Sequence, residues 1–160
     1  MDFDFSDDQI SLRDAVAKWV EKGFDFSRRH GIAKAEGVWD DARFRDQIAL
    51  LEVDVVALEM MVLRVLSAEK SGKQSLDVAG LLKIRGSEIQ QRYSELMMQA
   101  AGPFALPFIH EAMEAGWQGE HVGAAHCAPL AGTYFNMRKT TIYGGSNEVQ
   151  RNIVAQTVLG

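Results

Sequence analysis

The sequence predicts an all-α protein, an up-down bundle of helices, and three observations lead to that fold class. Apolar residues recur every three or four positions along two long segments, the chain has only three prolines, and no segment shows the alternation typical of a strand. A length of 160 residues is enough for one domain with a sizeable core. Apolar residues make up 47% and charged residues 24%, which is ordinary for a globular protein.

The first helix is expected to begin at Ser6, whose hydroxyl can cap it, with Gln9 completing a capping box. Apolar residues follow at helical spacing, and Gly23 is expected to end this helix. A shorter helix of mixed and basic residues is expected over residues 26–36, and it should stop at Gly37.

The strongest pattern in the chain predicts a long helix after Asp40 and Asp41, either of which can cap it. Its apolar seam advances in steps of four and three residues: Phe44, Ile48, Leu51, Val55, Leu58, Val62 and Val65. A repeat of this kind is typical of an antiparallel bundle. Apolar residues on the other faces predict that this helix is buried at the centre of the bundle.

A second long helix is expected from about Leu76 to Ala101, where Gly102-Pro103 ends it. Gly80 and Gly86 lie inside it, and we expect them to allow close approach of a neighbouring helix.

The stretch over residues 103–127 is irregular, yet it is apolar enough to pack on the bundle through Phe104, Leu106 and Phe108. A third long helix should run from about Pro129 to Thr141.

The last helix should follow the turn Tyr143-Gly144-Gly145-Ser146, with Ser146 as its cap and its apolar side chains Val149 and Ile153 buried. A helix start with unpaired backbone N–H groups can bind an anion or another ligand. Paired glycines between helices also occur for conformational reasons alone, so the pattern by itself leaves both interpretations open.

Metal-capable side chains gather in one loop, at Glu120, His121, His126 and Cys127. Their spacing matches no compact zinc motif, and no glutamate is followed three residues later by histidine, as a di-iron bundle would require. A polar loop with scattered histidines is the simpler interpretation, and we predict no metal site.

Net charge and hydropathy indicate whether the protein binds nucleic acid, is secreted or spans a membrane. The net charge of −5 argues against nucleic acid as a partner, because a phosphate-binding face normally carries a basic excess. The acidic start over residues 1–5 does not look like a signal peptide, and the most apolar segment, residues 53–66, is interrupted by charges. We therefore expect a cytoplasmic protein that does not cross a membrane.

Four stretches of the chain resemble acyl-CoA dehydrogenases. The most specific is residues 142–155, IYGGSNEVQRNIVA, which is similar to the C-terminal signature of that family. The others are Arg138-Lys139, the helix end Gln99-Ala100-Ala101-Gly102-Pro103, and the start FDFSDDQ at residues 3–9. The two ends match in the right order, which argues against an unrelated bundle that carries the signature by chance.

The resemblance implies a plan of an N-terminal helical domain, a central β domain and a C-terminal four-helix bundle. It also implies a reaction in which FAD accepts a hydride and a carboxylate base removes a proton, so that a double bond forms between the α and β carbons of an acyl-CoA thioester. Residues 1–37 look like the opening helices and residues 38–160 like the C-terminal bundle. The chain as given has no room for the β domain, so we expect a truncated or internally deleted form without full activity.

The resemblance also implies roles for single residues. Ser146 and Glu148 match positions that contact FAD, and Gly145 matches a backbone contact near the substrate thioester. Gln99 and Gly102 match a loop that reaches the adenosine diphosphate part of FAD from a neighbouring subunit; Pro103 stands there in place of a second glycine.

The resemblance implies no catalytic residue in this chain. Many members carry the glutamate base directly after the tyrosine of the signature, and here that position is Gly144. The main alternative to an enzyme of this lineage is therefore a non-catalytic helical oligomerisation module. In either case we expect exposed apolar surface and a homo-oligomer, a dimer or a tetramer.

Overall fold

The computed structural model of the protein describes residues 26–70 and 76–159, together with Ile10 and Asp14. Every regular element in these ranges is a helix. The α-helices are α2 (Phe26–Ala35), α3 (Ala42–Lys70), α4 (Leu76–Ala101), α5 (Leu130–Met137) and α6 (Asn147–Leu159). Short 3-10 turns are η1 (Val38–Asp40), η2 (Gly102–Ala105), η3 (His110–Met113), η4 (Ala125–Cys127) and η5 (Arg138–Thr141). The all-α prediction is confirmed.

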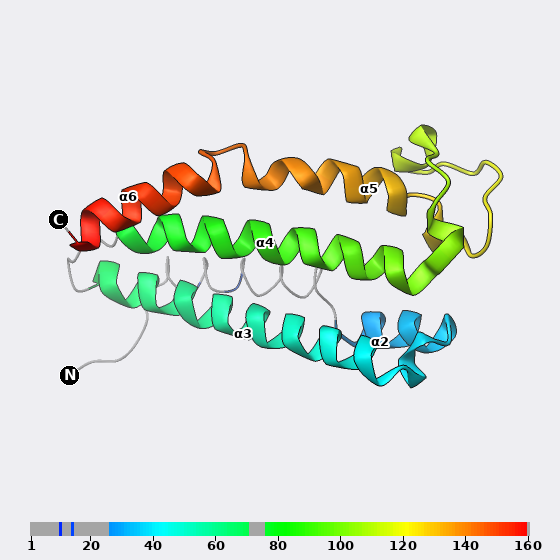
Figure 1. Cartoon of the computed structure of the whole chain (residues 1–160), viewed down its shortest axis with the longest axis horizontal. Coiled ribbons are helices and arrows are strands. Elements are labelled where there is room, and N and C mark those ends of the chain that lie inside the picture. The colour runs from blue at the N-terminus through cyan, green and yellow to red at the C-terminus, as the bar shows by residue number, and fades with distance from the viewer. Residues whose placement is uncertain (1–9, 11–13, 15–25, 71–75, 160) are drawn as a thin grey trace.

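The helices form an up-down bundle with α4 in the middle (Figure 1). Helix α3 runs antiparallel to α4 along one side. Helices α5 and α6 return along the opposite side, with α5 on the C-terminal half of α4 and α6 on its N-terminal half. The short helix α2 lies beside the start of α3, and the long loop between α4 and α5 occupies the same end of the molecule.

The predicted seam of α3 forms the first part of the core. Phe44, Ile48, Leu51 and Val55 are buried there, together with Ile89, Leu96 and Ala100 of α4. The prediction that α3 lies at the centre is wrong, because its outer face carries exposed apolar residues such as Val53, which is 65% exposed. Helix α4 takes the central place, since helices flank it on both sides.

Glycines were expected to allow close helix packing at Gly80 and Gly86 and to end a helix at Gly37. At Gly80 of α4 an added Cβ would lie 3.0 Å from side-chain atoms of Gln150 and Val154, so the predicted close approach is confirmed, with α6 as the neighbour. At Gly86 an added Cβ would meet nothing within 4 Å, so no close approach occurs there among the described residues. Helix α2 ends as expected, because Gly37 takes a left-handed φ of 74°.

Two apolar segments that were expected to be buried are exposed. Phe104, Leu106 and Phe108 of the long loop have exposed side chains, and so do Val149 and Ile153 of α6. Helix α6 packs on α4 along one side, so the rest of its apolar surface remains uncovered.

The predicted helix from Ser6 to Gly23 lies outside the described residues, apart from the helical Ile10 and Asp14. Across the part of the chain that the structure describes, no helix has the length and apolar character needed to cross a membrane.

Candidate functional site

The turn before α6 is built on two glycines with left-handed backbone. Gly144 has φ 67° and Gly145 has φ 83°, a region that other residues rarely adopt. The side chain of Gln150 closes the turn, because its Nε2 donates a hydrogen bond to the Gly144 carbonyl at 3.1 Å. An added Cβ at Gly145 would lie 2.7 Å from that same Nε2. The backbone conformation of the turn therefore favours glycine at both positions.

Ser146 caps α6 as predicted. Its Oγ accepts a hydrogen bond from the Val149 N–H at 3.4 Å, and its carbonyl accepts one from the Gln150 N–H at 2.9 Å. Capping by serine satisfies one of the backbone donors that a helix start leaves unpaired. Ser146 is half-buried and Glu148, in the first turn of α6, is exposed, so both side chains lie where another molecule can reach them.

Gly144, which the sequence resemblance aligns with the position of a glutamate base, has no side chain that could accept a proton. An added Cβ there would meet nothing within 4 Å. The described residues thus leave space beside Gly144, while its left-handed φ of 67° disfavours any residue with a side chain.

The carboxyl group of Glu148 has a pKa below its usual value. The largest cause is a hydrogen bond from its own backbone N–H, followed by one from the Ser146 hydroxyl. Desolvation opposes these hydrogen bonds, and the positive charges of Arg151 and Lys83 lower the pKa further. The first turn of α6 thus holds a carboxylate in its ionised form, as the positive end of a helix dipole favours.

We expect Glu148 to make the stability of α6 depend on pH. Because its pKa is lower in the folded chain than in the unfolded one, the ionised carboxylate stabilises the fold above the unfolded-state pKa. This contribution is lost as the pH falls through the folded-state pKa. The difference in unfolding free energy between wild type and Glu148→Gln should be constant near neutral pH and vanish in acid. Glu120→Gln, which removes an exposed loop carboxylate, is the control; an equal pH dependence in it would contradict the prediction.

Asn147, between the two predicted flavin contacts, anchors the start of α6 to α4. It is 4% exposed, and its Oδ1 accepts hydrogen bonds from Lys83 Nζ at 2.7 Å and from Ser87 Oγ at 3.2 Å. A surface ion pair between Arg151 and Glu88, with 2.8 Å between Nη2 and Oε1, joins the same two helices one turn further on. No local pattern in the sequence marks Asn147, because its partners lie on another helix.

Gln99 and Gly102 lie at the other end of α4 from Ser146 and Glu148. Asn147 contacts Lys83 and Ser87, and Gln99 follows these along the same helix. At a rise of 1.5 Å per residue, the two predicted groups are roughly 18–24 Å apart along the helix axis. The structure therefore brings Ser146, Gly145 and Glu148 together and leaves Gln99 and Gly102 as a separate group.

A polar groove of about 370 Å³ runs along α4 and ends at Gln99. Gln47 of α3 lines one side and Arg138 lines the other. Its charged residues are two arginines, Arg92 and Arg138, and two glutamates on α4, so the groove has no excess charge that would select an anion. Ser146 and Glu148 do not line it.

Arg138, which belongs to one of the stretches that resemble acyl-CoA dehydrogenases, holds η5 against α4. Its Nη2 donates to the carbonyl of Gln91 at 2.7 Å and to Ser94 Oγ at 2.9 Å. Its guanidinium carbon lies 4.3 Å from the centre of the Tyr134 ring, and Gln91 Nε2 donates back to the Arg138 carbonyl at 3.0 Å. This clamp fixes the segment that leads into the glycine turn.

The comparisons with known proteins agree on one family. The sequence model of the protein family described as acyl-CoA dehydrogenase, C-terminal domain, matches residues 24–159 of this chain. The curated acyl-CoA dehydrogenase IpdE1 of Mycolicibacterium smegmatis is 27% identical over 139 residues, which cover 84% of this chain and 31% of that protein.

Solved structures support the fold. The Tcur3481-Tcur3483 steroid ACAD superposes with a TM-score of 0.59 at 20% identity, covering 95% of this chain and 34% of its own. A variant of the same protein gives a TM-score of 0.58, also at 20% identity and with the same coverage. This chain thus spans about a third of the length of the relatives that it matches. Since the family model covers most of the sequence, the chain belongs to the acyl-CoA dehydrogenase family of FAD-dependent oxidoreductases.

Proposed function

We propose that this chain is the helical part of an acyl-CoA dehydrogenase, which contributes flavin contacts and an oligomer interface but no catalytic base. In this proposal residues 1–37 correspond to the N-terminal helical segment of the family and residues 38–160 to its C-terminal bundle, in a cytoplasmic protein. The turn over Gly144 and Gly145 with the capped start of α6 carries the proposal, because it presents reachable polar groups in a fixed geometry.

We expect this chain to contact FAD through two separate groups of residues, one at the start of α6 and one at the C-terminal end of α4. When bound, FAD would supply the hydride acceptor for the oxidation of an acyl-CoA thioester. Ser146 and Glu148 would hold it at the start of α6, with the Gly145 backbone near the substrate thioester, whereas Gln99 and Gly102 would meet the adenosine diphosphate part of a flavin bound to a neighbouring subunit. The separation of these groups along α4 supports this division between subunits.

We expect this chain alone not to catalyse the dehydrogenation of an acyl-CoA. Dehydrogenation requires a base within hydrogen-bond reach of the substrate α proton. Gly144 offers no side chain at the matching position, and no carboxylate of the described residues lies within 4 Å of the place that its Cβ would take.

The test combines flavin binding with an activity assay on the full chain. We expect added FAD to give a flavin absorption band that survives desalting, and Ser146→Ala and Gln99→Ala each to weaken it. Ser67→Ala, an exposed serine on α3, is the matched control and should leave the band unchanged. We expect no acyl-CoA-dependent reduction of an electron acceptor. A colourless protein would contradict the flavin contacts, and measurable turnover would contradict the absence of a base.

A non-catalytic oligomerisation module is the second candidate, and the exposed apolar rows favour it. One row lies on α6, at Val149 and Ile153, and another on α3, where Val53 and Met60 are exposed. Exposed apolar rows of this kind commonly mark protein interfaces. Sedimentation at micromolar concentration should give a homodimer or a homotetramer, whether or not FAD is bound. A monomer would contradict both this candidate and the division of the flavin site between subunits.

A further inference from the structure

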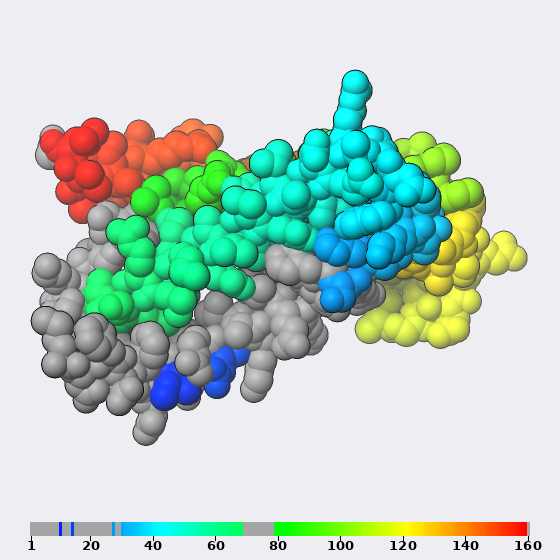
Figure 2. All heavy atoms as spheres, turned by 90° about the horizontal axis from the view of Figure 1, so that it is seen from below, coloured from blue at the N-terminus to red at the C-terminus, as the bar shows by residue number. Residues whose placement is uncertain are grey.

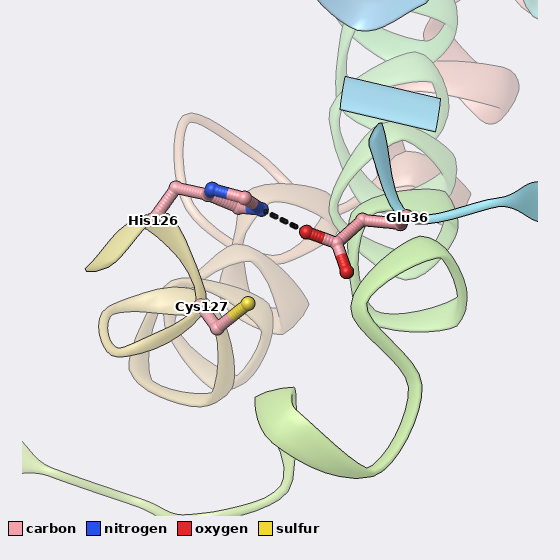
Figure 3. A group of neighbouring side chains, drawn as sticks. All are labelled: Glu36, His126 and Cys127. Atoms are coloured by element: carbon pink, nitrogen blue, oxygen red, sulfur yellow. Dashed lines mark ion pairs between the residues drawn. The ribbon is translucent and has the colours of Figure 1, made fainter. Parts of the chain in front are cut away.

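Three side chains with metal-binding atoms meet where the end of α2 touches the loop before α5 (Figure 3). Glu36 lies directly after α2, while His126 and Cys127 belong to η4. Their ligand atoms all lie within 4.8 Å of one another, and His126 Nε2 is 3.0 Å from Glu36 Oε1. Figure 2 shows this loop next to α2 at one end of the molecule. The fold thus assembles one nitrogen, one oxygen and one sulfur from segments far apart in the sequence.

The ring nitrogen of His126 is the least satisfied atom of this cluster. Nε2 is buried and has no hydrogen-bond partner among the described residues, although Glu36 is within ion-pair distance. Buried polar atoms are nearly always hydrogen-bonded, and an exception calls for an explanation such as an ion. In the tautomer that leaves Nε2 unprotonated, this nitrogen has the lone pair that a metal ligand requires, and a carboxylate oxygen lies 3.0 Å from it.

The donor set matches zinc better than a hard cation. Zinc accepts histidine nitrogen, cysteine sulfur and carboxylate oxygen at about 2.0–2.3 Å, whereas calcium and magnesium prefer oxygen ligands alone. Tetrahedral bonds of that length place the ligand atoms about 3.3–3.7 Å apart. The three atoms are within 4.8 Å now, so closing on the ion requires shifts of about 1 Å or less at each side chain.

The surroundings allow an ion to reach the cluster and to keep one open position. Cys127 is fully buried and packs with Ala101, Ala105 and Leu130, so its sulfur is held in place. The side chains of His126 and Glu36 are 29% and 17% exposed, so solvent reaches parts of both, although Nε2 of His126 and the Cys127 side chain are buried. We expect a water molecule that enters beside Glu36 and His126 with the ion to supply a fourth ligand.

We propose that Glu36, His126 and Cys127 bind one Zn²⁺ ion, with water as the fourth ligand. The carboxylate and the thiolate together balance the two positive charges, and the histidine binds as neutral imidazole. The thiol proton of Cys127 passes to solvent when the Zn–S bond forms, and no oxidant or reductant is needed. The ion would tie the end of α2 to the loop that connects α4 and α5. The sequence alone pointed away from a metal because Glu36 is remote from the histidines and the cysteine.

The test uses the full chain, stripped with a chelator and desalted, with Zn²⁺ and Co²⁺ as probes. We expect one equivalent of Zn²⁺ in competition with a chromophoric chelator, a thermal unfolding midpoint that rises with Zn²⁺ concentration, and a thiolate-to-cobalt charge-transfer band with Co²⁺. Cys127→Ser should abolish that band. Glu36→Gln, a change near the surface that keeps the buried sulfur, should weaken Zn²⁺ binding at least tenfold.

Two matched controls separate the cluster from ordinary surface binding. His121→Gln and Glu120→Gln remove exposed metal-capable residues from the same loop, and both should leave Zn²⁺ binding and the cobalt band unchanged. The proposal is overturned if the wild-type chain takes up no stoichiometric Zn²⁺. It is also overturned if Glu36→Gln and Cys127→Ser bind as wild type does, since the cluster would then be an ion pair beside a buried thiol.

Discussion

Replacing Leu51 with alanine should lower the free energy of unfolding by about 2–5 kcal/mol. Leu51 is 1% exposed and is among the largest fully buried side chains of the described core. It packs with Phe44, Ile48 and Ile89 where α3 meets α4. A void of about 20 Å³ already lies beside it, so the truncation would enlarge an existing cavity in two rigid helices that cannot easily collapse to fill it.

Leu50→Ala is the matched control for this prediction. The same atoms are removed one residue earlier in the same helix, but Leu50 is 55% exposed. Its loss should be about 0.5 kcal/mol or less. Urea unfolding at one fixed protein concentration would measure both values, because self-association would otherwise shift the apparent stability. Equal losses in the two variants would mean that the α3–α4 seam is not the core of the protein.

The contrast between these neighbours also explains how far the sequence could predict the fold. The seam through Leu51 and Val55 follows from local periodicity, and the structure buries it as predicted. The position of α3 does not follow from periodicity, because its second apolar face could be covered by another helix or remain exposed. Coverage depends on which elements are neighbours, and α6 shows the same limit, with Val149 and Ile153 exposed.

In the candidate site, too, the features set by neighbouring residues could be predicted from the sequence, whereas the contacts between distant segments could not. The cap at Ser146 and the turn at Gly144 and Gly145 depend on residues within a few positions, so the sequence predicts both, and the structure adds that the two glycines are left-handed. Contacts between distant segments carry no such local signal. The bond between Lys83 and Asn147 joins residues 64 positions apart, and the approach of Glu36 to the η4 loop is equally invisible in the sequence.

Removing the amide of Asn147 should detach the start of α6 from α4. Asn147→Leu keeps a side chain of similar length, but it leaves the partly buried ammonium group of Lys83 without its acceptor, whereas the Ser87 hydroxyl keeps the Ile84 carbonyl at 2.8 Å. Loss of one partner from a buried hydrogen bond costs about 1–3 kcal/mol, and more when the other partner is charged. Flavin binding should fall with it, because Asn147 lies between Ser146 and Glu148.

Asn147→Asp distinguishes this hydrogen bond from a simple effect of shape. The aspartate keeps an oxygen acceptor for Lys83 and places a negative charge at the positive end of the α6 dipole, so its stability should match or exceed that of wild type. Asn152→Leu, an exposed position on the same helix, should be nearly neutral. If Asn147→Asp and Asn147→Leu were equally unstable in urea, packing around Asn147 and not its carbonyl oxygen would hold α6 in place. The order Asp, then Asn, then Leu would establish that a polar contact between helices positions the turn that carries the proposed flavin contacts.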